Sequence, residues 1–190
     1  MKEKIIFLDR DGVINKNPQT EYVTSLEKFE FIPGAVEAIE RLSAAGYKIF
    51  VISNQQGVGK GLYTQKTLDK ITQWMVKKIE EKGGQIAGVY YCTHLEEENC
   101  LCRKPKTGLI EKAMGEVKKD LRETFFIGDT ELDIKTGEAA GCKTVLVLSG
   151  KAGNSDIEKW HVRPDYIFKD LKGAVDFILT LPFYTEEKSY

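Results

Sequence analysis

Short, continuous runs of apolar residues recur along this chain of 190 residues, and stretches with helical periodicity separate them. The run at 5–8 has no polar interruption, which is typical of a strand buried on both faces of a parallel sheet. After Pro33-Gly34, apolar residues at 36, 39 and 42 predict an amphipathic helix. Strands that alternate with single helices form right-handed crossovers. The sequence therefore predicts an α/β fold, a Rossmann-like, doubly wound parallel sheet with helices on both faces.

The same patterns give approximate bounds for each element. Strands are expected at 5–8, 48–52, 86–91, 125–127, 144–148 and 166–168. Helices are expected at 35–45, 65–82, 109 to about 119, 131–140 and 171 to about 179. Thr64 has the character of an N-cap, and residues 184–190 are expected to form a frayed tail. No repeat, linker or boundary divides the sequence, so residues 1–190 are predicted to form one domain.

The composition argues against several function classes. The formal net charge is -1, so the chain as a whole does not attract nucleic acid or an anionic membrane surface. No apolar run approaches the roughly 20 residues of a membrane span, and no signal-peptide pattern is present. Three of the four cysteines lie close together, which suits a metal site better than a disulfide framework. We therefore expect a cytoplasmic protein that binds neither nucleic acid nor membrane.

Acidic pairs follow two of the expected strands directly: Asp9 with Asp11, and Asp129 with Asp133. Ligands of a doubly wound sheet bind beyond the carboxyl ends of its strands, so the two pairs are expected to meet. Adjacent carboxylates repel one another unless a cation lies between them, and an all-oxygen ligand set suits Mg²⁺. Taken alone, the first pair could be a turn and the second could be acids favoured by a helix dipole. Their joint presence at strand ends favours an active site.

These residues have the chemistry of phosphoryl transfer. One carboxylate of the first pair can attack phosphorus and form an aspartyl phosphate, and the other can protonate the leaving oxygen and later activate water. The oxygens of the transferred group also need positive and hydrogen-bonding partners. Lys104 offers a point charge for this purpose, and Ser53 with nearby backbone amides offers neutral donors.

A second cluster lies between the acidic pairs. Cys92 and His94 are separated by five residues from Cys100 and Cys102, which provides four ligands for tetrahedral zinc. No ligand position stays open for substrate, so we predict a structural zinc site. The alternative is a set of reduced cysteines beside a loop histidine, which leaves thiols unexplained in a polar loop. The glycines at 57, 59 and 61 lack the spacing of a dinucleotide fingerprint and indicate a turn or a mobile substrate loop.

Four segments together resemble the motifs of the haloacid dehalogenase-like (HAD) phosphatases, namely 9–13, 53–55, 103–105 and 128–133. The loop at 92–105 is similar to the zinc loop shared by D-glycero-D-manno-heptose 1,7-bisphosphate 7-phosphatases and histidinol-phosphate phosphatases. Further segments resemble the heptose bisphosphate subgroup, at 22–23, 29–34, 54–57, 61–64 and 90–92. The resemblance implies Mg²⁺-dependent removal of the 7-phosphate, on the way to activated heptose for lipopolysaccharide or another surface glycan.

The resemblance also implies a role for individual residues. Asp9 is the implied nucleophile and Asp11 the general acid/base, with Ser53 and Lys104 as stabilisers of the phosphoryl group. The implied Mg²⁺ ligands are Asp9, the backbone carbonyl of Asp11 and Asp129, with Asp133 in support, and the implied Zn²⁺ ligands are Cys92, His94, Cys100 and Cys102. The implied substrate-binding residues are Arg10, Gln19, Thr20, Glu21, Tyr22, Asn54, Gln55, Gln56 and Arg103.

The spacing of the motifs leaves no room for a cap domain, either between 11 and 53 or between 53 and 103. The zinc loop and the loop at 15–23 are therefore expected to select the substrate, and a monomer is expected. Thr130 stands where the heptose enzymes can carry a lysine. Three alternatives stay open: a histidinol-phosphate phosphatase, a zinc-stabilised module without catalysis, and a phosphotransferase on DNA ends, which the net charge does not support. The preferred anomer of the sugar 1-phosphate is also open.

Overall fold

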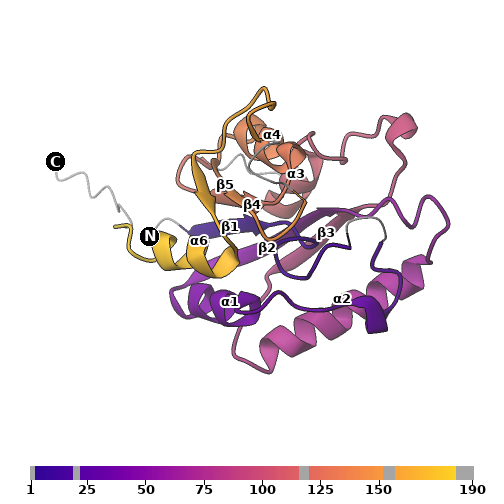
Figure 1. Ribbon diagram of the computed structural model, residues 1–190, viewed down its shortest axis with the longest axis horizontal. Coiled ribbons are helices and arrows are strands. Elements are labelled where there is room, and N and C mark those ends of the chain that lie inside the picture. Colours follow the sequence, from indigo (N-terminus) through magenta and orange to yellow (C-terminus); the bar gives the residue numbers. More distant parts are fainter. Residues whose placement is uncertain (1–2, 19–21, 116–119, 152–156, 183–190) are drawn as a thin grey trace.

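Six parallel strands form the centre of the molecule in the computed structural model, which describes residues 3–18, 22–115, 120–151 and 157–182. The strand order across the sheet is β3-β2-β1-β4-β5-β6 (Figure 1). In chain order the strands are β1 Lys4–Leu8, β2 Tyr47–Asn54, β3 Gly88–Cys92, β4 Phe125–Gly128, β5 Lys143–Val147 and β6 Tyr166–Phe168. The chain begins at the centre of the sheet, builds one half outward, and then builds the other half. The predicted doubly wound α/β fold with a parallel sheet is confirmed.

Helices cover both faces of this sheet (Figure 1). The helices are α1 Ala35–Ala44, α2 Gln65–Glu80, α3 Gly108–Met114, α4 Glu131–Ala139 and α6 Leu171–Ile178, and 3-10 turns lie at η1 Leu26–Lys28 and η2 Glu96–Glu98. Buried side chains of α1, α2 and α6 share one apolar core, whereas those of α3 and α4 pack on the opposite face. The sheet is therefore covered on both sides, as its apolar strands require.

The alternation of side chains along β1 explains the two cores. Ile6 and Leu8 belong to the core that contains α1, α2 and α6, whereas Ile5 and Phe7 belong to the core that contains α3. Each fully buried aliphatic or aromatic side chain of this kind contributes about 2 kcal/mol to folding. Because both faces of β1 are buried, a polar residue at any of these positions would destabilise the protein.

The observed bounds refine the predicted ones. The side chain of Thr64 accepts a hydrogen bond from the Thr67 N–H at 3.1 Å, so the predicted N-cap of α2 is confirmed. The helix expected to run to about residue 119 instead ends at Met114, because Gly115 adopts a left-handed φ of 69°. Residues 116–119 and the predicted tail at 184–190 lie outside the described part of the chain.

The candidate site residues gather at the carboxyl edge of the sheet. Asp9 follows β1, Ser53 lies near the end of β2, Cys92 ends β3 and Asp129 follows β4. Within the described ranges no separate cap domain is evident over this edge, and the zinc-type loop at 92–105 projects beside it (Figure 1). None of the helices in these ranges has the length and apolar content that a membrane crossing requires.

Candidate active site and metal centres

A cavity of about 380 Å³ opens at the carboxyl edge of the sheet. Its lining contains all four predicted catalytic residues, Asp9, Asp11, Ser53 and Lys104, together with the predicted Mg²⁺ ligand Asp129. The sheet topology is responsible for this convergence, because β2, β1 and β4 are adjacent and end at the same edge.

Asp9 is a buried residue that lines the cavity. Its backbone N–H donates to the Ile127 carbonyl at 2.9 Å, which ties the residue to the neighbouring strand β4. Its carboxylate forms an ion pair with Lys104, with Oδ1 at 3.0 Å from Nζ. Burial raises the pKa of Asp9 to about 6, although the positive charge of Lys104 acts in the opposite direction. The carboxylate is therefore mostly ionised at neutral pH and is available as a nucleophile.

Lys104 is a buried cation between two carboxylates. Its ammonium group contacts Asp9, donates to Asp133 Oδ1, and donates to the Ile52 carbonyl at 3.1 Å. Burial opposes the charged form, but the carboxylates of Asp133 and Asp9 hold the pKa of Lys104 above its ordinary value. A permanent positive charge therefore lies directly beside the candidate nucleophile.

The Asp129 carboxylate is enclosed by two glycines. A Cβ atom at Gly12 would lie 2.3 Å from Asp129 Oδ2, and one at Gly150 would lie 2.0 Å from it. Only glycine leaves room for the carboxylate at these two positions. The Lys151 backbone N–H donates to Oδ2 at 2.8 Å, whereas Oδ1 is buried without a hydrogen-bond partner in the described part of the chain.

This unpaired oxygen belongs to a cluster that fits Mg²⁺. One carboxylate oxygen from each of Asp9, Asp129 and Asp133 lies within 4.8 Å of the others. Burial, reinforced by the charges of Asp133 and Asp9, raises the pKa of Asp129 to about 8. A divalent cation would neutralise this repulsion, and hard oxygen ligands suit Mg²⁺. Asp9 and Asp129 are the candidate ligands in the described geometry.

Asp133 has a supporting position in this cluster. Its Oδ2 accepts hydrogen bonds from the Thr130 N–H at 3.0 Å and the Thr130 hydroxyl at 2.6 Å, while Oδ1 accepts from Lys104. Both oxygens are therefore engaged by the protein, and Asp133 orients Lys104 while it closes the first turn of α4.

Asp11 is held in place by a fully buried arginine. Arg10 Nη2 donates to both carboxylate oxygens of Asp11, at 2.8 and 2.9 Å, and Arg10 Nε donates to Oδ1 at 3.1 Å. Asn15 Nδ2 donates to Oδ1 at 2.8 Å, and Gln55 Nε2 donates to Oδ2 at 2.6 Å. Burial opposes ionisation, but the Arg10 charge and the hydrogen bonds from Asn15 and Gln55 hold the pKa of Asp11 below its ordinary value.

Two residues predicted to bind substrate therefore lie behind the cavity wall instead of lining it. Arg10 is 0% exposed, and its guanidinium lies 5.7 Å from the centre of the Tyr91 ring as well as on Asp11. Gln55 is buried, contacts Asp11 and Ser53, and accepts a hydrogen bond from the Tyr63 hydroxyl at 2.7 Å. Both side chains orient Asp11 in this structure.

The other predicted substrate-binding residues in the described ranges do line the cavity. They are Tyr22, Asn54, Gln56 and Arg103. Asn54 Oδ1 accepts from the Lys104 N–H at 3.1 Å, and Asn54 Nδ2 donates to the Lys104 carbonyl at 3.3 Å, so Asn54 holds the segment that carries Lys104. Gln19, Thr20 and Glu21 lie outside the described residues.

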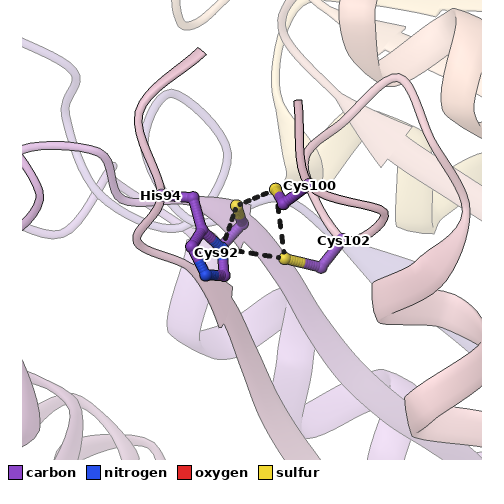
Figure 2. Close-up of side chains that lie close together, drawn as sticks. All are labelled: Cys92, His94, Cys100 and Cys102. Atoms are coloured by element: carbon purple, nitrogen blue, oxygen red, sulfur yellow. Dashed lines mark hydrogen bonds between the residues drawn. The ribbon is translucent and has the colours of Figure 1, made fainter. Parts of the chain in front are cut away.

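Four side chains converge at the end of β3 and in the loop that follows it (Figure 2). The Cys92 sulfur lies 3.6 Å from His94 Nδ1 and 3.6 Å from the Cys100 sulfur, and the Cys102 sulfur lies 3.2 Å from His94 Nδ1 and 3.5 Å from the Cys100 sulfur. Zinc–sulfur bonds of 2.3 Å in a tetrahedron place the sulfur atoms about 3.8 Å apart. The four side chains are therefore compatible with zinc in a closed coordination shell.

The zinc-type loop is continuous with the catalytic segment. Cys102 is followed directly by Arg103 and Lys104, and Lys106 Nζ donates to the carbonyls of Asn99 and Cys100 at 2.9 Å each. A Cβ atom at Gly108 would lie 2.5 Å from the Leu101 carbonyl, so α3 begins in close contact with the loop. The position of the loop and the position of Lys104 are thus coupled through the backbone.

Several residues of the site were not predicted from the sequence. Asn15 contacts Asp11, and Lys151 and Leu132 line the cavity. Lys151 could have been found, because it follows β5 at the same carboxyl edge. Asn15 gave no such signal, because it reaches Asp11 through a turn in which the Gly12 N–H donates to the Asn15 carbonyl at 2.7 Å.

Comparison with known proteins adds independent information. A family model described as HAD-hydrolase-like matches residues 101–174. The D-glycero-beta-D-manno-heptose-1,7-bisphosphate 7-phosphatase of Neisseria meningitidis is 36% identical over 178 residues, which are 93% of this chain and 95% of the relative. The protein of the same name from Pseudomonas putida is 38% identical over 168 residues, covering 88% of this chain and 95% of the relative.

A solved structure is similar over nearly the same range. The D,D-heptose 1,7-bisphosphate phosphatase from B. bronchiseptica, complexed with magnesium and phosphate, superposes with a TM-score of 0.87. Its sequence is 29% identical, and the match covers 93% of this chain and 98% of that chain.

Proposed function

The chain belongs to the D-glycero-D-manno-heptose 1,7-bisphosphate 7-phosphatases of the HAD superfamily, and from this premise we propose how its own residues perform the reaction. The enzyme hydrolyses the 7-phosphate of the heptose bisphosphate and leaves the sugar 1-phosphate. The relatives are named for the beta anomer, so we propose the beta 1-phosphate as the preferred substrate. The product would supply activated heptose for a surface glycan.

The observation that carries the mechanism is the ion pair between Asp9 and the buried Lys104, both of which line the cavity. The Asp9 carboxylate attacks phosphorus, a bond forms between its oxygen and phosphorus, and the bond from phosphorus to the sugar oxygen breaks. Asp11 donates its proton to that leaving oxygen. Lys104 and Ser53 then face the oxygens of the transferred group, where negative charge develops.

In the second half of the reaction, Asp11 takes a proton from water while the water oxygen bonds to phosphorus. The bond from phosphorus to Asp9 breaks, which regenerates the Asp9 carboxylate and releases inorganic phosphate. When bound by Asp9, Asp129 and the Asp11 carbonyl, Mg²⁺ would neutralise part of the negative charge of the phosphoryl group. The lowered pKa of Asp11 favours its ionised form in the described arrangement. The negative charge of an arriving phosphate favours protonation of Asp11, which the first half of the reaction requires.

We propose a structural task for zinc. With Cys92, His94, Cys100 and Cys102 as ligands, the metal would fix the loop that ends in Arg103 and Lys104. Arg103 and Lys104, at the end of this loop, line the cavity. We further propose that residues 1–190 form one domain and that the enzyme is a monomer. We also propose a cytoplasmic location, because three free cysteines in a metal cluster suit a reducing compartment.

Steady-state kinetics with purified enzyme and Mg²⁺ test the proposed function. We expect kcat/KM to be highest for the beta heptose 1,7-bisphosphate, lower for the alpha anomer, and lowest for histidinol phosphate. Asp9→Asn should abolish turnover while the protein stays folded. A preference for histidinol phosphate would replace the proposed substrate, and full activity of Asp9→Asn would favour a different active site or a non-catalytic module.

A further inference from the structure

Gln55 is a buried residue whose two amide ends have different partners. Its Nε2 donates to Asp11 Oδ2 at 2.6 Å and to the Ser53 hydroxyl at 3.2 Å. Its Oε1 accepts from the Tyr63 hydroxyl at 2.7 Å. The backbone is held as well, because the Gln55 N–H donates to the Cys92 carbonyl at 2.7 Å. The main freedom left to this side chain is a half-turn of the amide, which would exchange its donor end and its acceptor end.

Such a half-turn would change the group that Asp11 meets. An ionised carboxylate only accepts hydrogen bonds, whereas a protonated carboxyl group also has a proton to donate. In the observed orientation Gln55 offers N–H groups to Asp11, so the amide does not accept the Asp11 proton. In the turned orientation the amide oxygen would accept that proton and compete with the leaving oxygen of the substrate. The direction of the amide therefore matters for the step in which Asp11 acts as a general acid.

Tyr63 favours the observed direction of this amide. Its side chain is buried, and burial raises the pKa of its hydroxyl to about 12, so the hydroxyl keeps the proton that it donates to Gln55. A turned amide would remove the acceptor of this hydroxyl. Loss of an acceptor is unfavourable for a buried donor, so the Tyr63 hydroxyl opposes the half-turn.

The loop between β2 and α2 fixes the position of the Tyr63 ring. A Cβ atom at Gly57 would lie 2.3 Å from this ring, so a side chain there would displace it. The Leu62 N–H donates to the Gly57 carbonyl at 2.9 Å, which returns the chain to Gly57 directly before Tyr63. The next residue is Thr64, the N-cap of α2. The packing of the loop and the start of a helix therefore hold the hydroxyl at the Gln55 amide.

We propose that Tyr63 is a positioning residue for the general acid and acts through Gln55: its hydroxyl holds the amide so that the donor end faces Asp11. This inference rests on the proposed function, in which Asp11 protonates the leaving oxygen. Neither Tyr63 nor Gln55 is among the described residues that line the cavity. Their contribution is therefore to the rate of the reaction and not to the binding of substrate.

A double-mutant cycle tests whether Tyr63 acts through Gln55. Tyr63→Phe removes only the hydroxyl, Gln55→Met keeps a side chain of similar length without the amide, and the third variant combines the two changes. Tyr63→Phe should lower kcat for the heptose bisphosphate by about fivefold, the effect of one neutral hydrogen bond, with little change in KM. In the Gln55→Met background the same change should have almost no further effect, because the group that Tyr63 orients is absent.

The choice of leaving group tests which step is affected. Release of the leaving group in the first turnover is measured for the heptose bisphosphate, whose sugar oxygen needs a proton, and for 4-nitrophenyl phosphate, whose leaving phenolate is a stable anion. Tyr63→Phe should slow the first release and leave the second almost unchanged. Tyr166→Phe is the matched control, because Tyr166 lies in β6 with its ring against Phe177, and it should keep both wild-type rates.

Three results would overturn the positioning role while the proposed function stands. They are an unchanged kcat in Tyr63→Phe, equal slowing of both substrates, and an undiminished effect of Tyr63→Phe in the Gln55→Met background. Circular dichroism verifies that the variants are folded. A wild-type enzyme without activity on the heptose bisphosphate would overturn the proposed function itself, and the positioning role with it.

Discussion

At the scale of single residues, the site consists of buried charges that the protein holds in pairs. Lys104 is paired with Asp9 and Asp133, and Arg10 is paired with Asp11. Removing one member of such a pair leaves an uncompensated buried charge, which costs about 3–5 kcal/mol. Each pair therefore tolerates the loss of neither partner, and each sets the protonation state of its catalytic carboxylate.

The pairing of Arg10 with Asp11 leads to a prediction about pH dependence. Arg10→Met removes the charge that lowers the pKa of Asp11, so the limb of the kcat profile that Asp11 controls should move to higher pH by about one unit. Arg10→Lys keeps the charge without the planar fork, so it should restore the position of the limb but not the full kcat. If both variants kept the wild-type profile, Arg10 would not set the state of Asp11. Circular dichroism would verify that each variant is folded.

Asp129 leads to a second prediction at this scale. Its pKa is raised from 3.8 to about 8, so in metal-free protein it contributes stability below the unfolded-state value and loses that contribution as pH rises through about 8. Mg²⁺ binds the ionised carboxylate, so saturating Mg²⁺ should raise Tm more at about pH 8.5 than at about pH 6. Asp129→Asn should lose this difference. An equal effect of Mg²⁺ at both pH values would contradict the role of Asp129.

Sequence patterns predicted most of these residues, but not all of their contacts. Asp9, Asp129 and Lys104 were predictable because they belong to strand ends and motifs whose position in an α/β sheet is known. The direction of a side chain is a matter of local packing, which the sequence does not display. For this reason Arg10 and Gln55 were expected at the substrate and instead lie on Asp11.

At the scale of elements, the loop at 92–105 links a metal cluster to a catalytic lysine. The four candidate zinc ligands lie before Arg103 and Lys104, and Asn54 of β2 holds the Lys104 backbone from the other side. The sequence predicted the ligands by their spacing. The sequence did not predict the hydrogen bonds from Lys106 to the carbonyls of Asn99 and Cys100, because such contacts of a long side chain leave no pattern in the sequence.

Removal of zinc tests this link between the loop and the cavity. In zinc-stripped but folded protein, we expect hydrogen exchange of residues 92–105 to increase, Tm to fall, and KM for the bisphosphate to rise. The reaction with a small generic phosphate ester should change less, because Asp9 and Asp129 belong to other elements. Full activity with full discrimination among sugar phosphates after zinc removal would contradict the proposed task of the metal.

At the scale of the whole molecule, the doubly wound topology brings distant parts of the chain to one edge. β1 pairs with β2 on one side and with β4 on the other, so the acids after β1 and β4 meet although about 120 residues of sequence separate them. The alternation of apolar runs and helices was enough to predict this arrangement. The end of α3 at Met114, just before Gly115, was not predicted. The apolar periodicity that predicted the helix does not show that a single glycine adopts a left-handed φ.

The central claim is that Asp9 accepts the 7-phosphate of the heptose bisphosphate, and a rapid-quench experiment tests it most directly. Enzyme with Mg²⁺ is mixed with substrate labelled in the 7-phosphate, quenched in acid within one turnover, and digested for peptide mapping. The account predicts label on the peptide that contains Asp9, sensitivity of the bond to hydroxylamine, and heptose 1-phosphate as the product. Label on another residue, or a product that has lost the 1-phosphate, would contradict it.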